Sequence, residues 1–255
     1  MGFVLKKIRL LAFLLRRVPR LGLGQVARGI HERQLAYLAM ELAEALPGRA
    51  DTIVDVGAHA GLVADALDFL YRPSRIWLFE PNPAQRPVLE QRFRGRAQFQ
   101  IIGKCLGESV GEVTFNVHEF DAASSLFDCK PGHLSAFGFS EQKTAVKVPM
   151  TTLREALPAD FPPIDLLVLD CQGAELSVLR GAGSTLGRTN WILCEVSFDP
   201  IYDGAPLWHE IHEFLRKSGF ELRSLGAFSG AGSCVQWADA LYGRAGAGLN
   251  PIDDA

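Results

Sequence analysis

The chain has 255 residues, a length that a single α/β domain commonly reaches and that does not require two domains. Hydrophobic residues make up 48% of it and charged residues 22%, which allows a large core and excludes a wholly disordered chain. The net charge of −3 gives no reason to expect nucleic acid as a partner.

Basic residues are concentrated at the start of the chain, where residues 1–20 contain six Lys or Arg and no acid. A helix over 3–18 would place Val4, Ile8 and Leu15 on one face and most of the charges on the other. Because charges interrupt the apolar run and no small-residue cleavage site follows, we expect neither a spanning helix nor a signal peptide. Two interpretations stay open: a helix packed on the domain, or an in-plane helix on an anionic membrane surface.

Short apolar runs begin near residue 51 and alternate with amphipathic stretches. The expected strands are 52–56, 75–80, 98–102, 164–170, 190–196, 220–225 and 234–242, and the expected helices are 61–71, 83–94, 173–181 and 206–218. This alternation predicts a mostly parallel sheet covered by helices on both faces. We therefore divide the chain into an N-terminal helical extension (1–50), a sheet domain (51–243) and a flexible tail (244–255).

Two further segments, 112–118 and 144–150, have the pattern of strands inserted after the third strand of the sheet. The polar, Phe-rich stretch 119–143 between them is long for a passive connection. We expect this stretch to act as a lid or as a substrate loop.

The five cysteines are widely spaced and form no CxxC pair, which is typical of a reducing cytosol without a disulfide framework or structural zinc. His209 and His212, with Glu210 and Glu213 beside them, superficially resemble a zinc-binding helix but miss its spacing. A solvated helix face is the better interpretation, and we expect no metal. We expect a cytoplasmic protein, with peripheral contact at the inner membrane face as the open alternative.

A glycine-containing turn, DVGAHAG at 55–61, follows the first expected strand directly, and Glu80 ends the second. In a doubly wound sheet, ligands bind beyond the carboxyl ends of the strands. The turn lets a ligand approach the backbone, and the helix after it begins with free N–H groups. The acid at position 80 can accept both hydroxyls of a ribose. This region is therefore the expected nucleoside site, although a tight strand–helix turn with a surface acid is the simpler alternative.

The glycine pattern G-x-x-x-G differs from the G-x-G-x-x-G that a dinucleotide site requires for its pyrophosphate. The turn also lacks Lys and Arg, which argues against a phosphate. S-adenosylmethionine (SAM) has no phosphate, and Asp55 suits its cationic amino group. The turn, Glu80 and the following Pro81-Asn82-Pro83 together favour SAM. An NAD-type oxidoreductase and a non-catalytic, membrane-associated binding protein are the alternatives.

Six segments carry a more specific combination of motifs. They are IVDVGAHAG (53–61), LFEPNP (78–83), SSLF (124–127), IDLLVLDCQGAELSVLRGA (164–182), EVSFDPIYDG (195–204) and ADALY (238–242). In these segments the chain resembles the FkbM family of methyltransferases, over about residues 50–243. The resemblance implies a class I SAM-methyltransferase fold: a Rossmann-like, seven-stranded mixed sheet with helices on both faces, its seventh strand antiparallel between the fifth and sixth. It also implies O-methylation of sugars, polyketides or related secondary metabolites.

Three positions depart from the family pattern. His59 stands where Asn is usual, Arg154 stands where Asp is usual, and Gly103-Lys104-Cys105 replaces a polar residue and Ala. The last departure affects the expected adenine contacts, since these usually come from the end of the third strand.

The expected cofactor contacts come from the turn and from the ends of the second, third and fourth strands. They are Asp55, Gly57, Ala58, His59, Gly61, Glu80, Pro81, Asn82, Lys104, Cys105 and Asp170. Methyl transfer is an in-line displacement in which positioning supplies most of the catalysis, and a general base helps an alcohol lose its proton.

Three of the candidates could serve the chemistry itself. Asp170 ends the fourth strand and can act as the base or orient the acceptor, or it can cap the helix that follows. Glu195, at the end of the fifth strand, can bind substrate hydroxyls or be a buried, paired acid. His59 can stack on the cofactor or reach the acceptor, or simply fill the turn.

Three further side chains are candidates for substrate contacts. Ser124 and Ser125 can hydrogen-bond the acceptor, but a loop turn explains them as well. Glu175 lies in the first turn of a helix, where an acid is favoured on structural grounds. The preferred acceptor is a glycan or a lipid-linked sugar, with a polyketide hydroxyl second, and nitrogen or carbon acceptors stay open.

Overall fold

The computed structural model describes residues 49–136, 138–229 and 235–246. The basic segment 3–18, the rest of the expected N-terminal helical extension up to residue 48 and the tail beyond residue 246 lie outside these ranges. Within the described ranges, no helix combines the length and the apolar character that crossing a bilayer requires.

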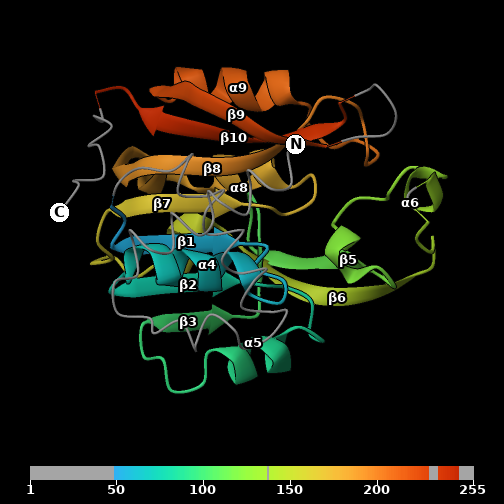
Figure 1. Cartoon of the computed structure of the whole chain (residues 1–255), viewed down its shortest axis with the longest axis horizontal. Helices are drawn as coiled ribbons and strands as arrows, with labels where there is room; N and C mark the ends of the chain where they lie inside the picture. The colour runs from blue at the N-terminus through green and yellow to red at the C-terminus, as the bar shows by residue number, and fades with distance from the viewer. Residues whose placement is uncertain (1–48, 137, 230–234, 247–255) are drawn as a thin grey trace, which may run out of the picture.

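The core of the molecule is a seven-stranded sheet with strand order β3-β2-β1-β7-β8-β10-β9 (Figure 1). The strands are β1 (Thr52–Val56), β2 (Arg75–Phe79), β3 (Phe99–Ile102), β7 (Ile164–Leu169), β8 (Thr189–Ser197), β9 (Phe220–Ser229) and β10 (Trp237–Arg244). The first five strands in this order pair in parallel, whereas β10 is antiparallel to both of its neighbours. The last strand thus lies between the fifth and the sixth, which confirms the expected fold.

Helices cover both faces of the sheet. They are α4 (Leu62–Tyr71), α5 (Arg86–Arg92), α7 (Leu153–Ala156), α8 (Glu175–Gly181), α9 (Trp208–Lys217) and the 3₁₀ segment η2 (Gly183–Arg188). Figure 1 shows α4 in front of the sheet and α8 behind it. The side chains of β1 alternate between the two cores: Ile53 packs in the α4 core, and Val54 and Val56 pack in the α8 core. Burial on both faces explains why the strands are continuous apolar runs in the sequence.

Between β3 and β7 the chain forms a second sheet of three strands, in the order β4-β6-β5. Its elements are β4 (Cys105–Leu106), β5 (Gly111–His118), β6 (Lys143–Thr151), the 3₁₀ turn η1 (Asp121–Ala123) and the short helix α6 (His133–Ala136). The antiparallel pair β5–β6 confirms the two expected inserted strands. We call residues 105–151 the inserted arm. Figure 1 shows it projecting from the edge toward which the parallel strands point.

The ends of several elements differ from the sequence prediction. Helix α5 begins after the expected residue 83, because Asn82 Oδ1 accepts the Ala84 N–H at 3.1 Å and forms a turn there. Helix α8 begins after the expected residue 173, because Gly173 has a φ of 100°, which no helix residue adopts.

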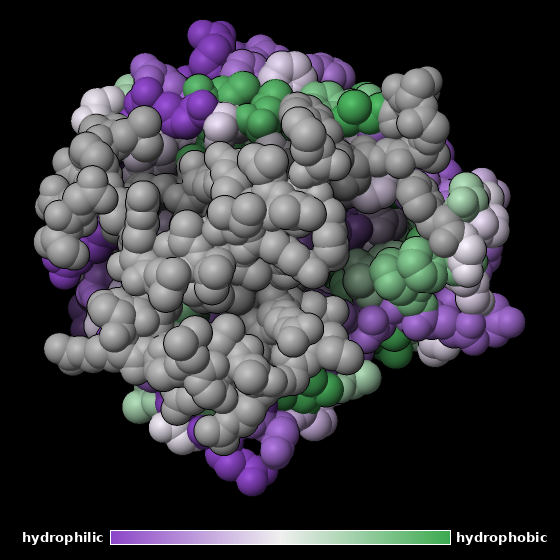
Figure 2. All heavy atoms as spheres, viewed as in Figure 1, coloured by the Kyte–Doolittle hydropathy of each residue, from purple (hydrophilic) through white to green (hydrophobic). Residues whose placement is uncertain are grey.

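Helix α9 carries the two histidines that superficially resemble a zinc site. His209 and Glu213 are exposed, Glu213 pairs with Lys217 at 2.7 Å, and the ring of His212 stacks on Trp208. Figure 2 shows hydrophilic and hydrophobic residues side by side along the upper edge, where α9 lies. The part of the chain that the structure describes brings together no group of three or more His, Cys, Asp or Glu able to hold a metal ion, and its four cysteines are free.

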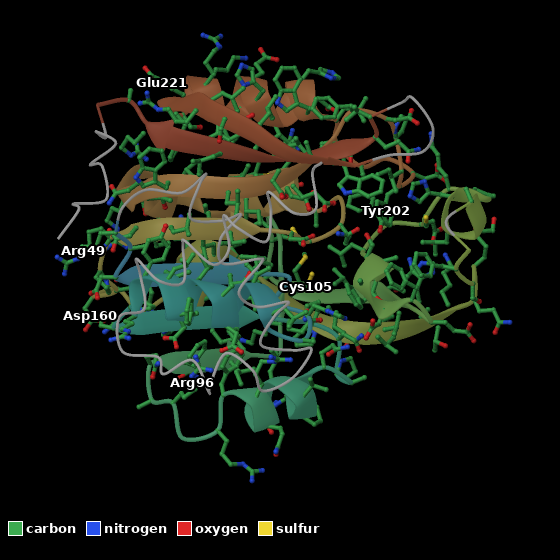
Figure 3. All side chains as sticks on the ribbon, viewed as in Figure 1. Arg49, Arg96, Cys105, Asp160, Tyr202 and Glu221 are labelled. Carbon is green, nitrogen blue, oxygen red and sulfur yellow. The ribbon has the colours of Figure 1, made fainter. Side chains whose placement is uncertain are left out.

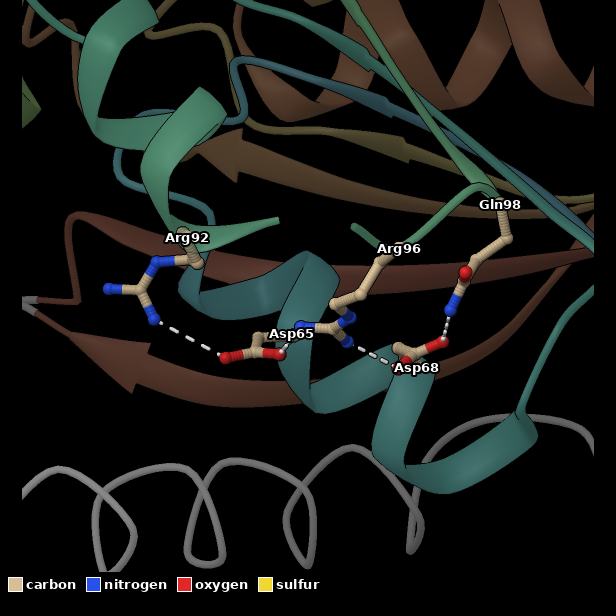
Figure 4. Close-up of polar contacts among 5 residues, drawn as sticks. All are labelled: Asp65, Asp68, Arg92, Arg96 and Gln98. Atoms are coloured by element: carbon tan, nitrogen blue, oxygen red, sulfur yellow. Dashed lines mark hydrogen bonds and ion pairs between the residues drawn. The ribbon is translucent and has the colours of Figure 1, made fainter. Parts of the chain in front are cut away.

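A network of charged side chains fastens α4 to the segment between α5 and β3 (Figure 4). Arg96 donates to Asp65 at 2.7 Å and also to Asp68, and its guanidinium lies 4.5 Å from the ring centroid of Phe99. The ring of Phe93 stacks on that of Phe99 with their centroids 3.9 Å apart, and the guanidinium also lies 5.0 Å from the Phe93 centroid. The side chains of Arg96 and both acids are less than a third exposed, so water weakens these ion pairs only in part.

We expect Arg96→Ala to lower the free energy of unfolding by about 2 kcal/mol, because it leaves two half-buried carboxylates without their shared partner. Urea unfolding measures this loss. The matched control is Arg86→Ala, which removes the exposed Arg86–Glu90 pair and should cost at most about 0.5 kcal/mol. Equal losses in the two variants would contradict a stabilising role for the network.

Candidate active site

A cavity of about 530 Å³, including its open mouth, lies between the carboxyl ends of the parallel strands and the inserted arm. The sheet contributes the ends of β1, β2 and β7, and the arm contributes residues of β5 and of the stretch 121–126. Figure 3 places Cys105 at the junction between the large sheet and the arm.

The glycine turn packs so tightly on the end of β7 that position 57 has no room for a side chain. Gly57 has a φ of 85°, and a Cβ built on it would lie 1.8 Å from the carbonyl oxygen of Asp170. Its N–H donates to the carbonyl of Phe79 at 2.9 Å. Gly61 has a φ of 79°, and a Cβ there would meet the ring of Phe93 at 2.7 Å. The two glycines therefore let the turn pack closely on β7 and α5 while its backbone borders the cavity.

Glu80 is buried beside the turn and is oriented by the backbone. Its Oε1 accepts the N–H of Asn82 at 2.7 Å, and its Oε2 accepts the N–H of His59 at 2.8 Å. Burial raises the pKa of Glu80, and these two bonds oppose the shift because they favour the ionised form. Each carboxylate oxygen can accept a further hydrogen bond, so both can receive hydroxyls in the cavity.

Asp55 lies directly behind the turn and does not line the cavity. Burial, together with the nearby charges of Asp170 and Glu80, raises the pKa of Asp55 to about 7. Its Oδ2 has no hydrogen-bond partner among the described residues. A buried carboxyl oxygen that still needs a donor suits a cationic amino group, directly or through water.

The inserted arm reaches the turn through Asp121, which the sequence analysis missed. His59 has a φ of 46°, a left-handed conformation that Asn, Asp and His adopt more readily than most residues, which explains why Asn is usual here. The Nε2 of His59 lies 3.0 Å from Asp121 Oδ1, although the two groups lack the alignment of a hydrogen bond. The other oxygen of Asp121 accepts from Gln85. Asp121 thus joins the arm to the segments on both sides of Glu80.

Asp170 follows β7 and Glu195 lies in the neighbouring β8, two residues before its end and not at it as expected, with the side chain of Gln172 between them. Gln172 Nε2 donates to Asp170 Oδ1 at 2.7 Å and to Glu195 Oε1 at 3.3 Å. Asp170 reaches solvent through the cavity, yet the protein packed around its carboxyl raises its pKa, and the bond from Gln172 opposes this shift. Burial also raises the pKa of Glu195 well above its ordinary value, and the negative charges of Asp170, Glu175 and Asp239 add to the effect.

Glu175 is engaged inside the protein. Its Oε1 accepts the N–H of Cys171 at 2.9 Å, and its Oε2 accepts the N–H of Gly173 at 3.0 Å. Burial raises the pKa of Glu175 to about 7. Because these bonds hold the loop that leads into α8, the geometry favours the structural alternative for Glu175 over a substrate contact.

The two serines have different surroundings. Ser125 is completely buried, donates to the carbonyl of Gln172 at 2.6 Å and accepts the N–H of Phe127 at 2.9 Å. Ser124 accepts the N–H of His118 at 3.1 Å and also lines the cavity. The geometry therefore keeps Ser124 as a candidate for substrate contact and favours a structural role for Ser125.

The cavity brings together about half of the expected site residues. Those that line it are Gly57, His59, Glu80, Pro81, Lys104, Cys105, Ser124 and Asp170, and those behind its wall are Asp55, Ala58, Gly61, Asn82, Ser125, Glu175 and Glu195. Asp121 and Gln172 also line the cavity, as do the apolar residues Leu106, Phe115 and Leu126, and no pattern in the sequence predicted these five. The stretch 119–143, expected as a lid or substrate loop, does reach the cavity.

Comparison with protein families shows which family has this arrangement of residues. Residues 55–222 match the model of the methyltransferase FkbM domain, which is more than half of the chain. The chain belongs to the FkbM methyltransferase family. The matched family is one of methyltransferases, which favours SAM over a dinucleotide as the ligand of the cavity. The chain spans less than two thirds of the length of the first two relatives described next.

Individual similarities are more distant. The 2-O-methyltransferase NoeI of Sinorhizobium fredii is 27% identical over 162 residues, which are 60% of this chain and 65% of that protein. The methyltransferase FkbM from Methylobacillus flagellatus has a TM-score of 0.49 and 15% identity, covering 91% of this chain and 60% of that one. The fibrillarin of Aeropyrum pernix, solved with natively bound SAM, has a TM-score of 0.49 and 16% identity, covering 82% and 74%.

The residues around the cavity fit SAM. Glu80 presents two oriented oxygens for the ribose hydroxyls, and Asp55 keeps a buried oxygen that lacks a donor. The glycine turn leaves its backbone accessible at Gly57. Lys104 is the one cationic Lys or Arg among the described lining residues, which suits a ligand without phosphate.

Proposed function

We propose that the protein transfers the methyl group of SAM to a hydroxyl of a sugar, a glycan or a related secondary metabolite. The observation that supports this proposal most strongly is the position of Asp170. This residue lines the cavity at the end of β7, two strands from Glu80 in the sheet order. A base at this place can receive the proton of a hydroxyl held against the cofactor. The name of NoeI, a 2-O-methyltransferase, supports a hydroxyl as the acceptor group.

SAM supplies an electrophilic methyl group and leaves as neutral S-adenosylhomocysteine (SAH). The protein holds the acceptor oxygen in line with the methyl carbon and the sulfur, which contributes most of the rate enhancement. As the oxygen–carbon bond forms and the sulfur–carbon bond breaks, the hydroxyl proton passes to the Asp170 carboxylate. Ser124 lines the cavity beside this path and binds a neighbouring hydroxyl of the acceptor.

A polyketide hydroxyl is the second candidate acceptor. The cavity has an apolar wall of Leu106, Phe115 and Leu126, which an aglycone with few hydroxyls would also contact. The sugar is preferred because the polar residues Ser124, Asp170 and Gln172 also line the cavity, and several hydroxyls on one ring can use them together.

The experiment is transfer of an isotope-labelled methyl group from SAM to a panel of acceptors. The panel contains free sugars, lipid-linked sugars (motivated by the basic segment 1–20), polyketide alcohols and an RNA oligonucleotide. We expect label in sugars, in a product that survives mild base because it is an ether and not an ester. Comparison of cell-surface glycans with and without the protein should show a species that loses one methyl group. Label found only in the RNA oligonucleotide, or in a product that mild base cleaves, would contradict the proposal.

A further inference from the structure

Gln172 has an unusual backbone conformation at the edge of the site. Its φ is 54°, in the left-handed region that non-glycine residues rarely adopt, and Gly173 after it also has a positive φ. Such conformations persist only where the surroundings hold them, and they gather at functional sites. Here Ser125 of the inserted arm holds the conformation, because its hydroxyl donates to the Gln172 carbonyl at 2.6 Å.

The side-chain amide of Gln172 is fixed in one orientation. The hydroxyl of Tyr202, from the loop after β8, donates to Gln172 Oε1 at 2.8 Å (Figure 3 labels Tyr202). Burial raises the pKa of Tyr202, so its hydroxyl stays a donor at every ordinary pH. The NH₂ group faces the carboxyls of Asp170 and Glu195, toward which a flipped amide would turn its oxygen. The Tyr202 hydroxyl, which also lies 3.2 Å from the Ala123 carbonyl, supports this orientation from the Oε1 side.

The bonds from this NH₂ group to the two carboxyls are unequal. The bond to Asp170 is 2.7 Å and the bond to Glu195 is 3.3 Å, so the ionised form of Asp170 gains more. The other titratable groups that face the pair include the acids Asp55 of β1, Glu175 of α8 and Asp239 of β10, which disfavour a second negative charge, and His59 of the turn. The thiols of Cys171 and Cys194 and the hydroxyl of Tyr202 also face the pair, and burial raises the pKa of each, so they stay neutral. The pair therefore favours a single negative charge, and the shorter hydrogen bond from the Gln172 amide favours that charge on Asp170.

We propose that Gln172 is a positioning residue that keeps Asp170 ionised and directed into the cavity while Glu195 carries a proton. The inference rests on the proposed role of Asp170 as the base beside the methyl donor. It links the inserted arm, through Ser125, and the loop after β8, through Tyr202, to the protonation state of the site. Correct packing of both segments is thus required before Asp170 can accept a proton.

The test compares the affinities of SAM and SAH for the full chain by calorimetry over a series of pH values. SAM carries a sulfonium charge that SAH lacks, so an ionised Asp170 near the sulfur favours SAM, and protonation of Asp170 removes the preference. In the native protein the SAM-to-SAH affinity ratio should fall as the pH is lowered through the pKa of Asp170. In Asp170→Asn the ratio should be independent of pH.

Gln172→Met keeps the length of the side chain and removes its donor and acceptor. We expect it to move the midpoint of the affinity-ratio titration to higher pH by about one unit, because the carboxylate loses a charge-assisted hydrogen bond. Tyr202→Phe releases the amide without touching either carboxyl, and should move the midpoint in the same direction by less. Gln91→Met, at an exposed position of α5, is the matched control and should leave the midpoint unchanged.

The outcomes separate this inference from the proposed function. A ratio independent of pH in the native protein would contradict the placement of Asp170 beside the sulfur, and with it the proposed base. A ratio that titrates in the native protein but keeps its midpoint in both Gln172→Met and Tyr202→Phe would contradict the role of Gln172 alone. A lowered melting temperature with an unmoved midpoint shows a merely structural role. If Gln172→Met does not fold, Tyr202→Phe decides the question.

Discussion

Replacing Glu80 with alanine is expected to weaken SAM binding by about 100-fold or more, measured by calorimetry. The carboxylate supplies an acceptor for each ribose hydroxyl, and a hydrogen bond to a charged group contributes more than one between neutral groups. The substitution also leaves the N–H groups of His59 and Asn82 without their acceptors, so the turn loses its orientation along with the two contacts.

The control for this variant is Glu90→Ala, which removes an exposed carboxylate on α5 and should leave SAM affinity unchanged. Acid should weaken SAM binding to the native protein, because the raised pKa of Glu80 brings its protonation into a higher pH range than for an ordinary glutamate. In the Glu80→Ala variant, the part of the pH dependence of SAM affinity that comes from Glu80 should be absent. Unchanged SAM affinity in Glu80→Ala would remove the ribose assignment and with it the basis for placing the cofactor.

The parts of the site that follow directly from a strand could be predicted from the sequence. Glu80 and Asp170 come one residue after β2 and β7, where the apolar run stops, and the parallel order of the strands brings these ends to one edge. The glycine turn is recognisable for the same reason: Gly57 is required where a Cβ would collide with the end of the neighbouring strand.

The parts that depend on irregular segments could not be predicted. Asp121 meets His59 only because the inserted arm folds back over the turn, and no periodic pattern in 119–143 announces that contact. Gln172 acquires its orientation from Ser125 and Tyr202, which lie 47 residues before it and 30 residues after it. These contacts are made between segments far apart in the sequence, so only the structure could distinguish Gln172 from an ordinary loop residue.

The hydrogen bonds of the two acids Glu175 and Glu195 distinguish a structural role from a role in the site. Glu175 is an acid near the strand ends, as a site residue would be, but both of its carboxyl oxygens accept backbone N–H groups. Glu195 differs, because its carboxyl accepts a hydrogen bond from the Gln172 side chain, which it shares with Asp170. A buried acid that shares a donor with another acid is a better candidate for proton chemistry than one that caps a loop.

Asp170→Asn is expected to lower the rate of methyl transfer by about 100-fold to 10,000-fold while the protein still binds SAM, because the amide cannot accept the hydroxyl proton. The measurement is release of labelled methyl product with the acceptor found in the panel above, under saturating SAM. Asp160→Asn, at an exposed position far from the cavity in Figure 3, is the matched control and should keep the native rate.

The pH profile distinguishes loss of a base from loss of a contact. In the native enzyme the rate should fall as the pH decreases through the raised pKa of Asp170, because the protonated carboxyl cannot accept another proton. The residual rate of Asp170→Asn should not show this decline, since the variant has no group at position 170 to protonate. A residual rate with the native pH profile would transfer the role of base to another group, with Glu195 the first to examine because it shares the Gln172 donor with Asp170.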